Sequence, residues 1–224
     1  MSAAELAPSG TLADLICNRV RSEILSGARR PQARIRLEEL KSEFNVSWSP
    51  LREALSRLVA EGLIQTDESR GYRVAAVSRA EMADVTHMRK TLESMALRAS
   101  IERGDDAWEA DVLAAHHRLT KLEAKRQRRE DLDQWEKWHR HYHETLTRAC
   151  GSPLLLQFCG QLHDQFARYR KLFLASHAFD RSVATEHKKL TDAALARDAD
   201  KACEVMQSHI ERTGRNILAC IREE

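Results

Sequence analysis

Histidines are concentrated in the second half of this chain, where their spacing could support metal chemistry. Seven of the ten histidines lie between residues 139 and 209. His139 and His143 are four residues apart and would share one face of a helix. His187 and His209 lie in two later segments of helical pattern. Two ligands from one helix and one from each of two others can build a metal centre inside a bundle, and neutral imidazole binds Zn, Ni, Cu or Fe.

The same histidines admit other interpretations. Scattered histidines are often surface residues or hydrogen-bonded core residues, and His163 could line the same interior without binding a metal. Three histidines around an open coordination position could also activate water, as in zinc hydrolases. That enzyme interpretation lacks a compact motif such as HExxH to supply a general base. A metal site with a purely structural role is a further alternative.

The histidines lie in a region that is almost purely helical. Ser78 and Glu81 have the spacing of a capping box and predict a helix that ends near Arg103. Antiparallel helices of the predicted lengths make an all-α bundle with room for an internal pocket. The further helices are predicted at roughly residues 106–125, 130–149, 153–176, 181–197 and 199–222.

Residues 37–63 carry a second, separate pattern. Apolar residues three and seven positions apart mark a short helix at the start of this segment, and a turn follows it. A second apolar stripe begins at Leu51. Ser47 or Ser49 can cap the second helix, and Gly62 can end it by adopting a positive φ. The segment therefore predicts a helix-turn-helix.

Short β-like segments accompany this motif. Ile64–Thr66 and Tyr72–Val74 are joined across Arg70-Gly71, and Ile35 opens a strand that we expect to pair with them. This arrangement is typical of a winged helix-turn-helix, which lays one helix in a DNA major groove. An amphipathic helix is predicted before it at Leu12–Leu25, and its inner face would be Leu15, Ile16, Val20 and Ile24.

The two patterns predict a mainly α protein with an N-terminal winged helix-turn-helix and a C-terminal all-α bundle of six or seven helices. We expect a flexible tail at residues 1–11, the winged domain at 12–76 and the helical domain at 78–224. The 224 residues suffice for two modest domains, and 42% hydrophobic residues suffice for their cores.

Side chains around the start of the second helix of the motif are expected to face outward and meet base edges. The wing tip and a nearby run of arginines are candidates for phosphate contacts. The formal charge of the chain is only +2, so any electrostatic attraction to DNA must be local. The candidate DNA-binding residues are Arg36, Trp48, Ser49, Arg52, Arg57, Arg70, Gly71 and Arg73.

The remaining composition bears on the cellular compartment. The five cysteines are an odd number without metal-binding spacing, and we interpret them as reduced thiols of a cytosolic protein. The sequence has no signal peptide and no apolar run near the roughly 20 residues that a membrane span needs. We therefore expect a protein that neither spans a membrane nor is secreted.

With both patterns in view, the chain resembles the GntR family of bacterial transcription regulators, and within it the FadR-type subgroup with an all-helical FCD domain. Residues 103–113 and Lys121-Leu-Glu are similar to the carbon-starvation-induced repressors of glutarate and aminobutyrate catabolism. The family motifs are Val46-Ser-Trp-Ser-Pro-Leu-Arg-Glu-Ala-Leu55, Glu61-Gly-Leu63, Arg89-Lys-Thr-Leu-Glu93, His143-Glu-Thr-Leu, Cys150-Gly-Ser, Glu186-His-Lys-Lys-Leu, Ala196-Arg-Asp-Ala and His209.

The resemblance implies a homodimeric, cytoplasmic and nucleoid-associated regulator, more often a repressor, that binds double-stranded palindromic operator DNA. Its helical domain would bind a small organic acid, for which we expect a C4–C6 dicarboxylate, and would form the dimer. The resemblance implies no enzymatic activity; a metal-dependent hydrolase with an accessory DNA-binding domain is the alternative. The candidate effector-binding residues are Arg89, His163 and Arg168.

Two positions depart from the family pattern. Many FCD domains hold one divalent metal through an Asp and three His, and the three His positions match His143, His187 and His209, whereas His139 stands at the Asp position. An all-imidazole site favours Zn, with Ni, Cu or Fe as alternatives, over Mn or Mg. Trp48 stands where the family usually has an Arg that could contact guanine. The operator sequence of relatives is therefore not carried over to this chain.

Overall fold

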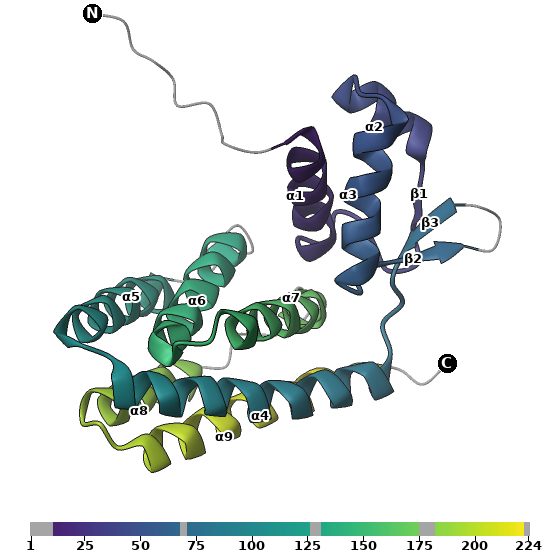
Figure 1. Ribbon diagram of the computed structural model, residues 1–224. Helices are drawn as coiled ribbons and strands as arrows, with labels where there is room; N and C mark the ends of the chain where they lie inside the picture. The colour runs from purple at the N-terminus through teal and green to yellow at the C-terminus, as the bar shows by residue number, and fades with distance from the viewer. Residues whose placement is uncertain (1–10, 68–70, 126–130, 175–181, 222–224) are drawn as a thin grey trace, which may run out of the picture. The chain divides into compact units, whose positions relative to one another are not determined.

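The computed structural model describes residues 11–67, 71–125, 131–174 and 182–221, and they form a mainly helical fold (Figure 1). The chain divides into two compact units, residues 1–76 and 77–224. The predicted fold class is confirmed: the first unit is a helix-turn-helix with a small sheet, and the second is an all-helical bundle.

The first unit contains a three-stranded antiparallel sheet, with β1 between α1 and α2 and with β2 and β3 after α3. The strand order is β1-β3-β2, and Ile35 is the register partner of Tyr72. Strand β1 therefore closes the wing formed by β2 and β3, as expected from Ile35. The elements are α1 (Leu12–Leu25), β1 (Arg34–Ile35), α2 (Leu37–Phe44), α3 (Trp48–Ala60), β2 (Ile64–Asp67) and β3 (Gly71–Val74).

Local chemistry explains the two helices of the motif. Helix α2 ends at Asn45, which adopts the left-handed conformation with φ 49°, and the turn beyond α3 holds Gly62 at φ 71°. Ser47 occupies the N-cap position of α3, but its side chain makes no capping hydrogen bond. Leu51, Ala54, Leu55 and Leu58 form the buried stripe of α3.

One prediction for the core of the first unit, the burial of Leu15, is wrong. Leu15 is 44% exposed, whereas Ile16, Val20 and Ile24 are fully buried as predicted. Helix α1 turns Cys17 inward instead, against the same cluster as the buried side chains of α3. A leucine adjacent to a buried stripe lies at its edge, where the packing of the neighbouring helix decides its burial.

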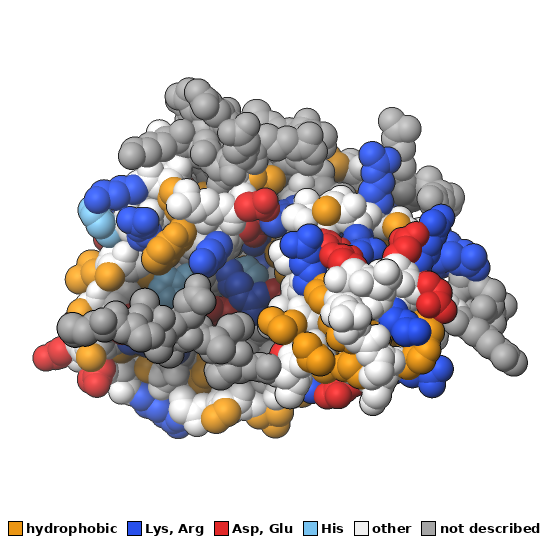
Figure 2. All heavy atoms as spheres, turned by 90° about the horizontal axis from the view of Figure 1, so that it is seen from above, with side chains coloured by type: hydrophobic (Ala, Val, Ile, Leu, Met, Phe, Trp, Pro, Cys, Tyr) orange, Lys and Arg blue, Asp and Glu red, His pale blue; other side chains and the backbone are white. Residues whose placement is uncertain are grey.

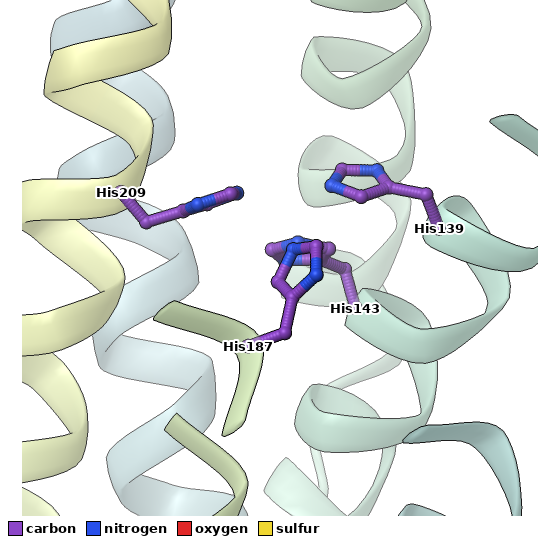
Figure 3. Close-up of side chains that lie close together, drawn as sticks. All are labelled: His139, His143, His187 and His209. Atoms are coloured by element: carbon purple, nitrogen blue, oxygen red, sulfur yellow. The ribbon is translucent and has the colours of Figure 1, made fainter. Parts of the chain in front are cut away.

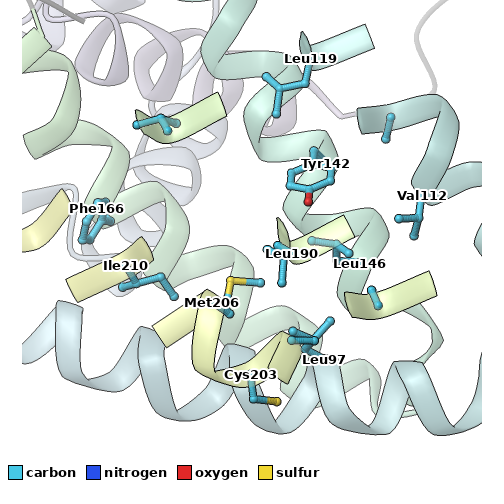
Figure 4. Close-up of a cluster of buried hydrophobic side chains, with 14 of the residues drawn as sticks. Leu97, Val112, Leu119, Tyr142, Leu146, Phe166, Leu190, Cys203, Met206 and Ile210 are labelled. Atoms are coloured by element: carbon cyan, nitrogen blue, oxygen red, sulfur yellow. The ribbon is translucent and has the colours of Figure 1, made fainter. Parts of the chain in front are cut away.

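The second unit consists of long helices around a large apolar core (Figure 4), with a smaller buried cluster of Ala96, Cys150 and Cys159 beside it. The longest helix, α4, packs along α9 and also against α7, while α5 packs on α6. Phe166, Tyr142 and Met206 lie in the core that these helices share. The elements are α4 (Arg79–Arg103), α5 (Asp106–Lys125), α6 (Asp131–Thr147), the 3-10 turn η1 (Arg148–Cys150), α7 (Pro153–Leu174), α8 (Ser182–Leu195) and α9 (Ala199–Leu218).

Only half of the predicted capping box forms at the start of α4. Ser78 accepts a hydrogen bond from the backbone N–H of Glu81. The Glu81 side chain does not return this bond; it accepts hydrogen bonds from the Tyr169 hydroxyl at 2.6 Å and from the Arg168 guanidinium at 3.1 Å. The start of α4 is thus tied to α7. Among the described residues, no helix is both long and apolar enough to cross a membrane.

Candidate metal centre and DNA-reading surface

Three helices bring four histidines together in the core of the second unit. His139 and His143 come from α6, His187 from α8 and His209 from α9, and their rings converge (Figure 3). One nitrogen of each ring lies within 4.8 Å of one nitrogen of every other ring. All four side chains are at most 4% exposed. The i, i+4 spacing on α6 places two rings on the inner face, as expected of a helix.

Carboxylates stand behind three of these rings. Nδ1 of His187 lies 2.8 Å from Glu123, and Nδ1 of His209 lies 2.9 Å from Glu186. Nδ1 of His143 is 3.6 Å from Glu93, which is an ion-pair distance but longer than a hydrogen bond. Metal-binding histidines commonly donate their second ring N–H to a carboxylate in this way.

The carboxylates leave the Nε2 atoms facing the centre. Nε2 of His143, Nε2 of His187 and Nδ1 of His139 are buried and have no hydrogen-bond partner among the described residues. A buried imidazole nitrogen without a partner costs free energy unless a ligand or an ion satisfies it. These atoms are therefore placed as metal ligands would be.

Burial also keeps the rings in the form that binds metals. Burial lowers the pKa of His143 to about 4, although the neighbouring Glu93 opposes this shift. The pKa values of His139 and His209 are lowered well below the usual range, first by burial and then by nearby positive charge. These rings are neutral at pH 7, with a free lone pair on one nitrogen.

The four residues fit a transition metal by ligand type and by spacing. Zn–N bonds are about 2.0–2.1 Å long, so tetrahedral ligand nitrogens lie about 3.4 Å apart. The observed limit of 4.8 Å requires the widest pair to close by roughly 1.4 Å, which small ring rotations can supply. His139 differs from the other three because it stacks on Trp135, with ring centroids 4.5 Å apart, and has no carboxylate partner among the described residues.

A cavity of about 250 Å³ adjoins the centre. His143 and His163 form part of its wall, together with the carboxyl group of Glu93. The remaining residues that line this cavity are Glu144, Thr147, Arg148, Leu156, Cys159 and Gly160. Figure 2 shows the molecule from above, with histidine and basic side chains visible in a hollow of that face.

Arg89 lies beside this cavity rather than on the surface. It is 1% exposed, and its Nε donates to Glu93 at 2.6 Å. Burial alone would raise the pKa of Glu93, but Arg89 and His143 lower it to about 2, so the carboxylate is ionised. Arg89 therefore pairs with a carboxylate of its own helix and lies close to the cavity wall. The remaining Arg89 Nη2 faces His163 at 3.4 Å.

His163 and Arg168 lie in different surroundings. His163 is buried, and its ring centroid lies 5.8 Å from that of His139, so it is adjacent to the cluster of four histidines. Arg168 contacts Glu81 and Tyr169 at the start of α4. Arg170 lies two residues later, and its Nη2 is instead 3.4 Å from Nε2 of His163.

The sequence did not identify two buried carboxylates that complete the site, Glu123 and Glu136. Glu123 contacts His187 from 64 residues away on α5, and Arg170 forms a fork of two hydrogen bonds with Glu136 on α6. No local spacing links these pairs. Only Glu186 carried a usable signal, because it directly precedes His187 on a helix that faces the centre.

Helix α3, the second helix of the helix-turn-helix, presents its first turn to solvent. Ser49 and Arg52 are exposed, as expected for residues that meet DNA. Trp48 is only partly exposed, because its ring packs against the unit's core and lies under the ammonium group of Lys41 at 4.6 Å. The prediction of a fully outward Trp48 is therefore only partly correct.

The other candidate DNA contacts differ in how they are held. Arg36 is 72% exposed and pairs with Glu39, while Arg57 is bound by Asp14 and Glu53. Gly71 and Arg73 lie on β3 at the wing, where Arg73 donates to the backbone of Gln32. Arg70 lies outside the described residues.

Comparison with known proteins assigns both units. A family model described as bacterial regulatory proteins, gntR family, matches residues 12–74, and an FCD domain model matches residues 84–212. The HTH-type transcriptional regulator BphR of Paraburkholderia xenovorans (strain LB400) is 39% identical over 203 residues, which cover 90% of this chain and 83% of that protein. The HTH-type transcriptional repressor GlaR of Escherichia coli (strain K12) is 39% identical over 195 residues, covering 85% and 89%.

Solved structures agree on the fold. The E. coli McbR/YncC structure superposes with a TM-score of 0.81 at 20% identity and covers 94% of this chain and 98% of that one. BphR and GlaR are described as an HTH-type transcriptional regulator and an HTH-type transcriptional repressor. The chain therefore belongs to the gntR family of bacterial regulatory proteins, carries an FCD domain and is a transcriptional regulator rather than an enzyme.

Proposed function

We propose that this protein is a cytoplasmic repressor that binds a palindromic operator as a homodimer and responds to a small organic acid at a metal-containing pocket. One observation carries this proposal: four buried histidines with inward nitrogens, three of them backed by carboxylates, share a chain with an exposed reading helix. The similarity to a repressor, GlaR, supports the sign of regulation.

Charge supports a divalent ion at the four histidines. Around them, the buried carboxylates Glu93, Glu123 and Glu136 outnumber the buried guanidinium groups of Arg89 and Arg170 by one. A divalent cation would change this excess to one positive charge, which an acid's carboxylate can neutralise. Four imidazole ligands favour Zn, with Ni, Cu or Fe as alternatives, and a bound metal would supply a coordination position for a carboxylate oxygen.

The size and chemistry of the cavity support a short acid as effector. Its volume of about 250 Å³ accommodates a C4–C6 dicarboxylate, and its wall includes His143 and His163. Arg89 lies behind that wall with a guanidinium group suited to a carboxylate. The resemblance of residues 103–113 to repressors of glutarate and aminobutyrate catabolism is consistent with this ligand class.

The contact between α7 and the start of α4 offers a route for the response. The Tyr169 hydroxyl accepts a hydrogen bond from the backbone N–H of Ser78 at 3.1 Å and donates to Glu81. His163 and Arg170 lie on the same helix as Tyr169. A ligand that moves α7 would therefore alter the hold on Ser78, next to residue 76 where the winged unit ends. The expected mechanism is a shift between two populations of the dimer that differ in operator affinity.

Metal analysis combined with operator binding tests the proposal. The purified protein should contain about one transition-metal ion per chain, and His143→Ala should remove it while His141→Ala, an exposed change on the same helix, should not. Glutarate should weaken operator retention by the metal-loaded protein. Metal that stabilises the fold without any acid response would favour the structural alternative. Turnover of ester or phosphate substrates that His143→Ala abolishes would favour the hydrolase alternative.

A further inference from the structure

The ammonium group of Lys41 lies over the ring of Trp48, where α2 gives way to α3. Lys41 belongs to the last turn of α2, and Trp48 is the first residue of α3. The Lys41 Nζ lies 4.6 Å from the centroid of the indole ring. The backbone N–H of Val46 donates to the carbonyl of Lys41 at 3.2 Å, so the turn folds back on α2 and brings the two helix ends together.

Lys41 turns toward this ring although an acid is available on its own helix. Glu38 lies three residues before Lys41 on α2, a spacing at which lysine and glutamate commonly pair. Among the described residues, Lys41 has no carboxylate partner. Its side chain is partly buried, and the four-carbon stem of a lysine can cover an apolar surface while its charged end stays in water. The ammonium group is therefore directed toward α3 rather than back along α2.

The basic side chains around α3 differ in how far acids neutralise them. Arg57, near the end of α3, is bound by Asp14 and by Glu53. Such pairing weakens the positive potential that a DNA phosphate would meet. Neither Lys41 nor Arg52 has a carboxylate partner within the part of the chain that the structure describes. Positive charge that is not neutralised is therefore concentrated at the start of α3, the end that approaches the major groove.

The indole ring of Trp48 can orient the ammonium group of Lys41 without neutralising it. A cation above an aromatic ring is attracted by the negative face of the ring, whereas a carboxylate would cancel the positive charge. The three N–H groups of the ammonium all stay available to an acceptor. Trp48 is itself held in place because it packs against the core of the first unit. Lys41 is therefore both oriented and fully charged.

We propose that Lys41 binds a phosphate group of the operator backbone and that Trp48 is the residue that positions its ammonium group. In helix-turn-helix proteins the first helix crosses the DNA backbone, while the start of the second helix meets base edges. A cation at the end of α2, beside the start of α3, faces the backbone where it borders the major groove. A side chain that is already oriented loses less conformational entropy on binding. This role does not depend on the proposed metal or acid response.

The salt dependence of DNA binding by the full chain tests the phosphate contact. The probe is a duplex that the wild-type chain selects from a random pool. Lys41→Gln should weaken binding about tenfold at low salt, and the slope of log affinity against log salt should become less steep by about 0.9 per bound chain. The order of preference among single-base variants of the duplex should stay the same, because phosphate contacts carry no direct sequence information.

A matched lysine in the second unit provides the control. Lys201→Gln removes an ammonium group that is 55% exposed on α9, and it should change neither the affinity nor the slope. A wild-type slope in Lys41→Gln, an altered order of base preference, or failure of the wild-type chain to select any duplex would overturn the phosphate contact. The measurement needs neither metal nor acid, so its outcome is separate from that of the proposed effector response.

A double-mutant cycle tests the positioning role of Trp48. The loss of affinity caused by Lys41→Gln should fall from about tenfold in the wild type to about threefold or less in a Trp48→Leu background. Trp48→Phe keeps an aromatic face and should preserve the full loss. Any contact of the indole with DNA is removed from both arms of the comparison. An equal loss in all three backgrounds would refute the positioning role, and the salt slope of Lys41→Gln needs no change at Trp48 if Trp48→Leu fails to fold.

Discussion

Nδ1 of His187 donates to the carboxylate of Glu123 at 2.8 Å, and both side chains are buried. This hydrogen bond fixes the ring so that Nε2, which has no partner among the described residues, faces the other histidines. The bond joins α5 to α8 across 64 residues of sequence. A change at Glu123 should therefore weaken metal binding at the proposed site without removing a candidate ligand.

Glu123→Gln should therefore lower the affinity for zinc by about ten- to a hundredfold, as loss of such a supporting carboxylate commonly does. The amide can no longer hold the N–H of His187 with a full negative charge. Competition with a chelator of known affinity measures the change. Glu204→Gln, at a carboxylate 69% exposed on α9, serves as the control. Equal zinc affinity in both variants would contradict a supporting role for Glu123.

Acid should destabilise the metal-free protein. The pKa of His143 is about 4 in the fold, mainly because of burial, and about 6.5 in the unfolded chain. The unfolded chain then binds more protons, so this contribution to stability is complete above about pH 6.5 and declines as the pH falls toward about 4. The urea concentration at the midpoint of unfolding should decrease as the pH is lowered from about 7 to about 5. His143→Gln should flatten this decline; an unchanged slope in that variant would refute the assignment.

Arg52→Ala should weaken operator binding by about ten- to a hundredfold, because a base contact of this kind contributes about 1–3 kcal/mol. Arg52 is exposed on the first turns of α3, so its removal leaves the core intact. Gel-shift titration with the operator measures the effect. Arg98→Ala, at an exposed arginine of α4 in the second unit, is the matched control. An equal loss in the two variants would mean that only overall charge matters.

Tyr169→Phe should uncouple acid binding from operator release. The change removes the hydroxyl that contacts Ser78 and Glu81, and it leaves the metal ligands untouched. Glutarate should still bind, but operator retention should respond to it less. Tyr142→Phe removes another buried hydroxyl, which contacts Thr191 and the backbone carbonyl of His187 on α8 and makes no contact with α4, and this variant should keep the response. A full response in Tyr169→Phe would exclude this route.

Much of the fold follows from the sequence alone, because its signals are local. Helix α1 spans the predicted Leu12–Leu25, and Gly62 adopts the predicted positive φ. Such features depend on residues within one or two turns of the helix. His139 and His143 were found in the same way, since i, i+4 spacing on α6 defines a face before any packing is known, whereas His187 and His209 were matched through the family resemblance.

Tertiary packing decided what stands around those histidines. Glu123 and Arg170 reach the centre from other helices, and the exposure of Leu15 depends on a neighbouring helix. Arg168 and Arg170 look equivalent in the sequence, yet one contacts Glu81 and the other contacts His163. Side chains two residues apart on a helix point about 200° apart. Only the packing of α7 therefore determines which of the two arginines faces the histidine cluster. The sequence therefore determined the candidate ligand histidines, and the tertiary structure determined which carboxylates and guanidinium groups surround them, because those contacts join helices far apart in the chain.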